Sequence, residues 1–263
     1  MRKKILFFTG TRADYGLLSP LIRNFYSDSN YETKILATGT HLEKDFGYSL
    51  NEIESDGFTV AFKIPLEQKS DSQIDVCASA GLGVQKFSQV LVQFEPDLCF
   101  VLGDRFEALS FVFAAHIHHC PVAHIHGGEV TGGAIDDAFR HAITKLSYLH
   151  FTSAEEHQKR VIQLGESPDR VFNVGALGVE NALSINKMTA SELENDLKIK
   201  LNKKLFLITF HPETLSEQTS EDQINQLMIS IDEINKDLPG QCSFVFTMPN
   251  SDPGFEPIRQ RST

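Results

Sequence analysis

Tryptophan is absent from the 263-residue sequence, cysteine occurs only four times, and no apolar run approaches the roughly 20 residues of a membrane span. The cysteines have no paired spacing, so we expect free thiols rather than a disulfide framework. The apolar start of the chain meets Arg12 and Asp14 too early for a complete signal peptide. These absences predict a cytoplasmic protein with no membrane partner.

Positive charge is also in short supply, since 24 Lys and Arg stand against 35 Asp and Glu and give a formal net charge of −11. This balance disfavours general binding to nucleic acid or to anionic membranes. Hydrophobic residues make up 41% and charged residues 22% of the chain, which is typical of a folded globular protein. The length accommodates one large domain or two modest ones.

Apolar segments with β-strand composition alternate with amphipathic helical segments, which predicts the α/β class with a doubly wound parallel sheet. The expected strands are 4–9, 31–38, 58–64, 98–102, 121–125, 149–152, 170–174, 204–210 and 244–247. The expected helices are 17–26, 42–55, 70–94, 106–119, one that opens at Asp136, 154–164, 184–203 and 221–237. A change in composition near 175–178 predicts a first domain of residues 1–176 and a second of residues 177–263.

Two successive apolar strands in the centre of the chain, 98–102 and 121–125, each lead into polar residues. The ionisable side chains that follow them are Asp104, Arg105, His126, Glu129, Asp136 and Asp137. Ligands of open α/β sheets bind at the carboxyl ends of the strands. Carboxylates and imidazoles that converge there provide general acid/base chemistry. We therefore expect the site at this edge.

Each candidate also has a structural interpretation. Arg12 precedes a helix and either binds a phosphate or carboxylate or forms a surface ion pair with Asp14. Asp104 either acts in the site or pairs with its neighbour Arg105. His211 follows the strand 204–210 and either faces a cleft or is a solvated loop residue. Asp136 and Asp137 open a helix, where the dipole favours acids in any case.

The histidines divide into two groups. His124 and His126 alternate along a strand, share one face, and precede two glycines that let the backbone approach a ligand, which favours a site. His116, His118 and His119 lie at a helix end with no acid or cysteine at a metal-ligand spacing, and we interpret them as structural. No metal site is expected.

Four separated motifs, taken together and in order, resemble those of the hydrolysing UDP-N-acetylglucosamine 2-epimerases of the sialic-acid and legionaminic-acid pathways. The motifs are GTRADYG at 10–16, GDRFE at 103–107, the segment 124–145, and TFHPET at 209–214. The resemblance extends to about Pro253. It implies two Rossmann-like domains of the B-type glycosyltransferase fold, with the active site between them. It also implies a nucleotide-sugar substrate, no cofactor, a homodimer, and a role in capsule or surface polysaccharide synthesis.

The family reaction implies specific roles. A base removes the C2 proton while the bond to UDP breaks, and water then adds to give UDP and a free N-acetylmannosamine-type sugar. By resemblance, the acid/base candidates are Asp104 and Asp136, while Arg12 and His211 hold or protonate the leaving phosphates. The catalytic set implied in this way is Asp104, His126, Glu129, Asp136 and His211. The substrate-binding set is Arg12, Asp14, Arg105, Asp137 and Asn250.

Two departures from the family pattern bear on these expectations. His126 stands where many members carry a catalytic Glu, so Glu129 supplies the carboxylate and the sugar differs, for instance a 2,4-diacetamido-trideoxyhexose. The family also continues past the strand that ends near Asn250. We therefore expect a truncated chain with an incomplete second domain, an unpaired sheet edge and weak activity. The alternatives are an inactive fragment that binds sugar nucleotides and a glycosyltransferase on the same fold. UDP and GDP are not distinguished.

Overall fold

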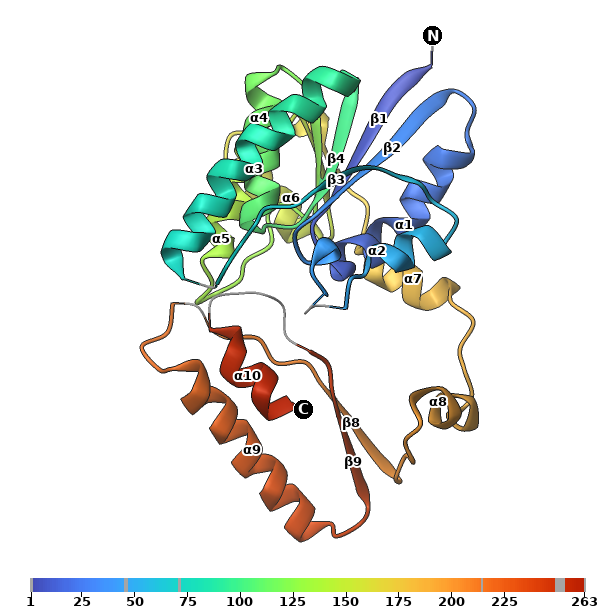
Figure 1. Ribbon diagram of the computed structural model, residues 1–263, viewed down its shortest axis with the longest axis vertical. Coiled ribbons are helices and arrows are strands. Elements are labelled where there is room, and N and C mark those ends of the chain that lie inside the picture. Colours follow the sequence, from blue (N-terminus) through green and yellow to red (C-terminus); the bar gives the residue numbers. More distant parts are fainter. Residues whose placement is uncertain (1, 45–46, 71, 214, 249–253, 263) are drawn as a thin grey trace. The chain divides into compact units, whose positions relative to one another are not determined.

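The computed structural model describes residues 2–44, 47–70, 72–213, 215–248 and 254–262, which fall into two compact units, Met1–Ser184 and Ile185–Thr263 (Figure 1). The sequence placed the boundary at 176/177. Helix α7 (Leu177–Ser184) nevertheless belongs to the first unit, because Asn181 Nδ2 donates a hydrogen bond of 2.8 Å to the carbonyl of Gly16 in helix α1 (Arg12–Ser27). None of the described helices combines the length and apolar character required to cross a membrane.

The first unit contains a seven-stranded sheet with the order β3-β2-β1-β4-β5-β6-β7, in which every neighbouring pair is parallel. Its strands are β1 (Lys3–Thr9), β2 (Tyr31–Thr38), β3 (Val60–Ile64), β4 (Leu98–Leu102), β5 (Val122–Ile125), β6 (Leu149–Thr152) and β7 (Val171–Asn173). The order reverses between β1 and β4, which is the topological switch point where ligands of such sheets bind. The predicted α/β class and parallel sheet are confirmed.

Helices cover both faces of this sheet (Figure 1). Helices α3 (Gln73–Phe94), α4 (Phe106–Ile117) and α5 (Asp136–Leu146) contribute to one apolar cluster, while α1 and α2 (Leu50–Ser55) contribute to another. Side chains that alternate along β1 divide between the clusters: Leu6 and Phe8 face the first, Ile5 and Phe7 the second. Helix α6 (Glu155–Gln163) packs against β6 and β7.

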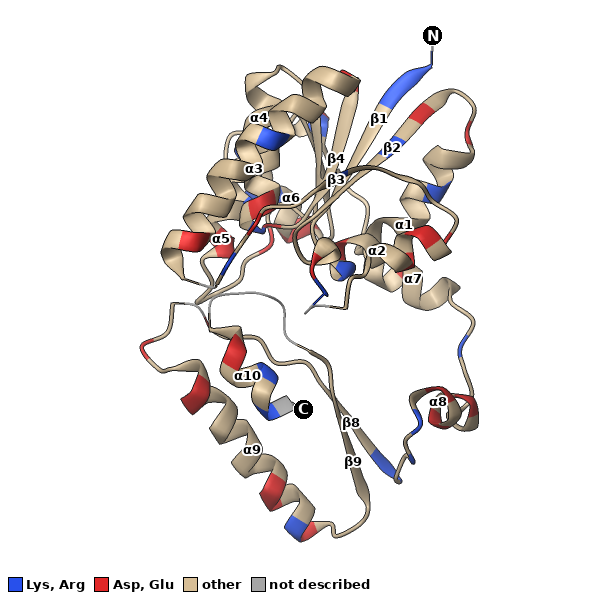
Figure 2. Cartoon of the chain, viewed as in Figure 1, with Lys and Arg blue, Asp and Glu red and all other residues tan. Residues whose placement is uncertain are grey.

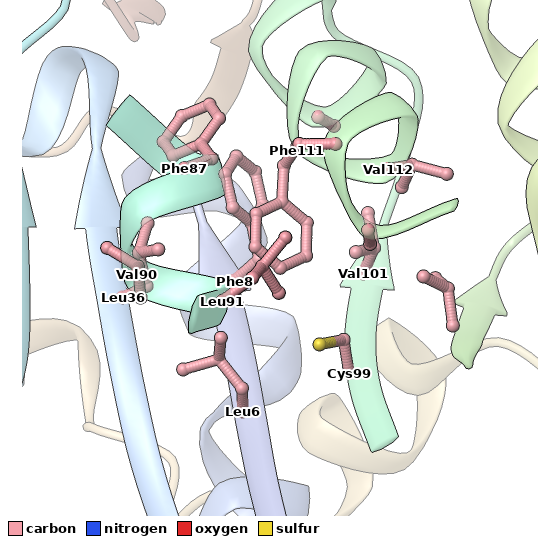
Figure 3. Packing of buried hydrophobic residues seen from close by; sticks show 14 of the residues in the cluster. Leu6, Phe8, Leu36, Phe87, Val90, Leu91, Cys99, Val101, Phe111 and Val112 are labelled. Carbon is pink, nitrogen blue, oxygen red and sulfur yellow. The ribbon is translucent and has the colours of Figure 1, made fainter. Parts of the chain in front are cut away.

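Aromatic side chains fill the first cluster (Figure 3). The ring of Phe8 stacks on Phe111 with centroids 4.8 Å apart and meets Phe87 edge-on at 5.7 Å. Phenylalanine thus supplies the large apolar surface that tryptophan does not. Cys99 is fully buried in the same cluster, and its Sγ lies 3.3 Å from that of Cys120. Both are free thiols, as the sequence predicted.

Helix α3 is continuous through Gly81 and Gly83. A Cβ atom on Gly83 would lie 3.0 Å from the ring of Phe87 and 3.4 Å from Cβ of Ser110 in α4. The missing side chain therefore lets α3 and α4 approach closely. This packing gain outweighs the weak helix propensity of glycine.

Two further helix boundaries differ from the expected ones. Helix α1 begins at Arg12 rather than 17, because Thr11 caps the backbone N–H of Asp14 while the Asp14 carboxylate accepts from the backbone N–H of Thr11. In the described part of the expected helix 42–55, the structure has the end of a short 3₁₀ turn, Gly39–Leu42, and helix α2. The chain at 39–42 follows the carboxyl end of β2 and so reaches the ligand-binding edge of the sheet.

The second unit contains a βαβ element in which β8 (Lys204–Ile208) and β9 (Cys242–Phe246) are parallel and α9 (Ser220–Asp237) connects them. Helices α8 (Ala190–Leu197) and α10 (Phe255–Ser262) complete its described part. Acidic residues open α9 and Lys236 lies in its last turn, as the helix dipole favours (Figure 2). Leu205 and Leu207 are 47% and 70% exposed. Strand β8 therefore exposes apolar side chains within the described residues.

Candidate active site

The loops that follow β4, β5 and β6 are joined to one another at the carboxyl edge of the first sheet. The backbone N–H of Gly103 donates to the carbonyl of Ile125, and that of His126 donates to Phe151. Side chains of these loops and of α5 form the further contacts described below. Asp104, His126, Glu129 and Asp137 therefore lie together at the edge predicted from the sequence.

Arg140 of α5 is the hub of this edge. Its side chain is only 7% exposed, and its guanidinium forms an ion pair with Asp104, which follows β4. It also donates to the carbonyl of Glu129 at 3.1 Å and to Thr131 Oγ1 at 2.9 Å, and Nη1 lies 3.4 Å from Asp137 Oδ1. The buried guanidinium of Arg140 thus contacts the carboxylates of Asp104 and Asp137 and the backbone carbonyl of Glu129, all three of them predicted site residues.

Arg140 is not among the site residues predicted from the sequence. A signal was present, because an arginine three residues after Asp137 lies on the same side of a helix as that carboxylate. The pairing with Asp104 spans 36 residues and could not be derived from local spacing. It also means that the Asp104 carboxylate has a buried basic partner other than its sequence neighbour. Arg105 Nε donates to Glu107 Oε1 at 2.7 Å.

His126 and Glu129 form a second link, after β5. His126 has a left-handed backbone with φ of 65°, and its Nδ1 lies 3.5 Å from Glu129 Oε1. Its Nε2 lies 3.5 Å from the backbone N–H of Leu177, which can only donate, so the ring proton belongs on Nδ1 and faces Glu129. Burial lowers the pKa of His126, and the charge of Glu129 partly opposes this shift. A neutral imidazole therefore supports the Glu129 carboxylate.

His124 does not share this role, which corrects the expectation that both histidines lie on one functional face. Strand β5 ends at Ile125, and the left-handed backbone of His126 breaks the alternation. The ring of His124 is fully buried, with Nε2 2.8 Å from the carbonyl of Gly103 and Nδ1 3.1 Å from Thr144 Oγ1. Burial lowers its pKa to about 3. It is a neutral core residue that ties β4 to α5.

The two glycines after His126 also have a different role from the expected one. A Cβ atom on Gly127 would lie 2.9 Å from Nδ1 of His124, and one on Gly128 would lie 2.4 Å from the carbonyl of His157 in α6. Neighbouring protein atoms, and not a ligand, thus occupy the space next to both glycines. They allow the loop to fit between α5 and α6.

Asp14 and Glu107 form an acidic pair near the switch point. Asp14 Oδ2 accepts from the backbone N–H of Gly10 at 3.2 Å and of Thr11 at 3.0 Å. Burial, and then the nearby charge of Glu107, raise the pKa of Asp14 to about 6, although Arg105 opposes the shift. Glu107 is 1% exposed, and its Oε2 has no hydrogen-bond partner among the described residues.

The remaining candidates are more peripheral. Arg12 is exposed at the first position of α1 and forms no ion pair within the described residues, so the alternative of pairing with Asp14 is not observed. Asp136 is the partly exposed first residue of α5. His211 is exposed and follows β8 in the second unit. Asn250 lies outside the described residues. The roles of all the candidates remain predictions.

The buried histidines predict a marked acid destabilisation. His41 lies between Thr9 Oγ1 and Ser49 Oγ, and burial lowers its pKa from 6.5 to about 4. The unfolded chain takes up protons on His41 and His124 first, so stability falls as pH drops below about 6.5, by about 2 kcal/mol for each at pH 5. The raised pKa of Asp14 acts in the opposite direction, by about 1.4 kcal/mol. Urea unfolding should therefore show a net loss of about 3 kcal/mol between pH 7.5 and pH 5.

A matched pair of variants checks this expectation. His124→Gln should flatten the pH dependence by about 2 kcal/mol over this range, because it removes one of the buried histidines that take up a proton on unfolding. His119→Gln changes an exposed histidine and should leave the pH dependence as it is. An unchanged slope in His124→Gln would contradict the assignment of His124 as a buried neutral group.

The family model described as UDP-N-acetylglucosamine 2-epimerase matches residues 23–263. A GDP/UDP-N,N'-diacetylbacillosamine 2-epimerase (hydrolysing) of Campylobacter jejuni is 39% identical over 95% of this chain and 64% of that protein. The polysialic acid biosynthesis protein P7 of Escherichia coli is 39% identical over 98% of this chain and 65% of its own length. This chain thus spans less than two thirds of the length of either relative.

Solved structures support the fold. The UDP-GlcNAc 2-epimerase of Neisseria meningitidis, bound to UDP-GlcNAc, superimposes with a TM-score of 0.80 at 23% identity, over 98% of this chain and 69% of that one. The Methanocaldococcus jannaschii UDP-GlcNAc 2-epimerase, in complex with UDP-GlcNAc and UDP, gives a TM-score of 0.75 at 19% identity, over 93% of this chain and 66% of that one. At these identities the likeness concerns the fold alone.

Proposed function

Because this chain belongs to the UDP-N-acetylglucosamine 2-epimerase family, we propose that it acts as a hydrolysing 2-epimerase on a UDP-linked 2-acetamido sugar. The products would be UDP and the free sugar with inverted configuration at C2. The observation that carries this proposal is the group of carboxylates gathered at one sheet edge by Arg140. Removal of a weakly acidic C2 proton requires a well-placed base, which transfer of the sugar to an acceptor does not.

We assign the C2 base to Glu129. Its Oε1 lies 3.5 Å from Nδ1 of His126 and accepts a hydrogen bond of 2.5 Å from Oγ of Ser153, so both side chains orient the carboxylate. Asp104, held by Arg140, and Asp136 at the start of α5 are the other acid/base groups, and one of them protonates C2 from the opposite face. A base and an acid on opposite faces account for inversion at this carbon.

The leaving nucleotide needs positive charge and proton donors. Arg12 is exposed and without an ion pair in the described chain, at the start of α1, where the helix dipole also favours a phosphate. We assign Arg12 and His211 to the nucleotide phosphates, and Asp14, Arg105, Asp137 and Asn250 to the remaining contacts with the substrate. These residues supply hydrogen bonds and charge without a metal ion.

The sugar is proposed to carry a second acetamido group at C4. The relatives from Campylobacter jejuni and Legionella pneumophila are both named as N,N'-diacetylbacillosamine 2-epimerases, at 39% and 32% identity. His126 supports this choice, because it occupies the site where UDP-N-acetylglucosamine enzymes of the resembling family carry a carboxylate. The E. coli relative belongs to polysialic acid biosynthesis, so UDP-N-acetylglucosamine is the necessary comparison substrate.

Product analysis in D₂O tests this function. Purified chain is incubated separately with UDP-N,N'-diacetylbacillosamine and with UDP-N-acetylglucosamine, and products are identified by NMR and mass spectrometry. We expect release of UDP and a manno-configured sugar that carries deuterium at C2. Asp104→Asn should lower turnover by about a hundredfold or more, the usual contribution of an acid/base group. Asp169→Asn, on the exposed turn before β7, should have no effect.

Other outcomes separate the competing functions. Release of nucleotide without deuterium at C2 would indicate cleavage or transfer at C1, and would reject the epimerase. Binding of both sugar nucleotides without any release would indicate a chain that binds its ligand but does not turn it over.

A further inference from the structure

A continuous line of hydrogen-bonding groups runs from Glu129 to the protein surface. Ser153 Oγ lies 2.5 Å from Glu129 Oε1 and 2.9 Å from Nδ1 of His157. The other ring nitrogen of His157, Nε2, lies 3.4 Å from the carboxylate of Glu156. The side chain of Glu156 is 76% exposed, so this line ends in solvent.

The backbone holds these groups in place. Ser153 follows β6, and His157 lies one turn along in α6, so the two side chains meet across a single helical turn. The carbonyl of His157 packs against Gly128, and Arg160 of the same helix donates to the carbonyl of Gly128. Helix α6 is therefore fixed directly against the loop that carries Glu129, and the spacing of the three side chains follows from this packing.

The proposed reaction requires a route by which a proton leaves Glu129. When Glu129 removes the C2 proton, hydration delivers a different proton to the opposite face of that carbon. The removed proton is therefore not returned to the sugar, and Glu129 must lose it before the next turnover. The side chain of Glu129 is 31% exposed, and its Oε1 faces both His126 and Ser153. We propose that Ser153 and His157 form a proton relay that carries this proton from Glu129 to solvent. The inference rests on the proposed function.

The relay moves one proton in two concerted hops. Protonated Glu129 donates to Ser153 Oγ while the hydroxyl proton of Ser153 passes to the free Nδ1 of His157. Glu129 becomes a carboxylate again, Ser153 keeps a hydroxyl that now points back to it, and His157 becomes an imidazolium. The imidazolium then releases its Nε2 proton to water beside Glu156, which leaves His157 protonated at Nδ1. When Glu129 next takes up a proton, the ring, whose side chain is 19% exposed, exchanges protons with water and returns to the tautomer in which Nε2 carries the proton and Nδ1 is free. No bond other than O–H and N–H is formed or broken, and no further reactant is needed.

A purely structural role for Ser153 and His157 predicts different behaviour. If they only orient Glu129, their loss would disturb substrate binding as well as turnover, and added small acids or bases would not repair it. If they carry a proton, their loss slows turnover alone, and a diffusible imidazole restores it by replacing the missing ring. Both residues act through Glu129 and are positioning or relay groups rather than catalytic residues.

Kinetics of the full chain test the relay. His157→Ala should lower kcat by about tenfold to a hundredfold with KM nearly unchanged, and imidazole in the buffer should restore kcat in a concentration-dependent way. Ser153→Ala should show the same loss of kcat without rescue. The missing hydroxyl lies between Glu129 and His157, where imidazole from the buffer cannot take its place. Glu155→Gln, an exposed residue of the same helix, is the matched control and should behave as the wild type.

A second measurement is independent of turnover. Nitrogen-15 NMR of histidine-labelled chain reports which ring nitrogen carries the proton. With Glu129 ionised, Ser153 donates to it, so the His157 Nδ1 must carry a proton and donate to Ser153. We expect this tautomer in the wild type and its loss in Ser153→Ala.

The outcomes separate the relay from the proposed function. Turnover in the wild type with unchanged kcat in His157→Ala would overturn the relay and leave the epimerase standing. Raised KM without rescue would equally overturn it in favour of a structural role. If neither substrate is turned over by the wild type, the proposed function fails for this chain, and a His157 protonated at Nε2 alone would overturn the hydrogen-bonded line as well.

Discussion

Replacing Arg140 by methionine will destabilise the first unit by about 3–5 kcal/mol and lower turnover by on the order of a thousandfold. The guanidinium is 7% exposed, and methionine of similar length keeps most of its packing while removing its charge. Asp104 and Asp137 would then lie at the sheet edge without their shared cation. The carbonyl of Glu129 and the hydroxyl of Thr131 would also lose their donor. The stability loss is measured by urea unfolding followed by far-ultraviolet circular dichroism, since the chain has no tryptophan.

Two further variants make this result specific. Arg140→Lys keeps the charge but not the planar fork that reaches several acceptors at once, so its losses should be intermediate. Lys159→Met breaks an ion pair with Glu155 at 2.6 Å in which both side chains are 72% exposed, and should cost at most about 0.5 kcal/mol. An Arg140→Met chain within 1 kcal/mol of the wild type would show that the carboxylates do not depend on this cation.

Substituting Gly128 by alanine is expected to cost at least about 3 kcal/mol and to lower the melting temperature by about 10 °C. Its φ of 80° is a left-handed conformation that disfavours a side chain. The added methyl would lie 2.4 Å from the carbonyl of His157 and 2.8 Å from Cγ2 of Val161. A backbone carbonyl of α6 cannot rotate away, so the loop or the helix must shift.

Gly132 provides the control within the same loop. A Cβ atom there meets nothing within 4 Å. Gly132→Ala should therefore change the melting temperature by no more than a degree or two, which thermal unfolding by circular dichroism will show. Equal effects of the two substitutions would mean that the contact with α6 does not restrict the loop.

Regular elements with a strong apolar pattern could be predicted from the sequence. Strand β4 has the expected bounds because it is a short apolar run that ends at a glycine, and the parallel arrangement follows from the alternation of strands and helices. The start of α1 was missed because it depends on reciprocal hydrogen bonds between Thr11 and Asp14. The glycine at position 83, in the interior of α3, is explained by packing against Ser110, in another helix. Both depend on contacts that a periodicity does not report.

The location of the site could be predicted from the sequence, but the contacts between its side chains could not. The carboxyl edge follows from general topology, and Asp104 and Glu129 are visible beside their strands. Arg140 and Ser153 were missed because their partners lie 36 and 24 residues away in the sequence. The ring of His124 was expected to share a function with His126, but whether a histidine on a strand is buried or exposed depends on where that strand ends.

The four polar contacts of Arg140 also restrict how this chain can diverge. A change at Asp104 or Asp137 alone leaves a buried cation with too little negative charge around it, and a change at Arg140 alone leaves the carboxylates without it. Single substitutions at these positions would be removed by selection before a compensating change arose. Sequence changes at Asp104, Asp137 and Arg140 are therefore expected to occur together, and related chains should keep or replace the three residues as a set.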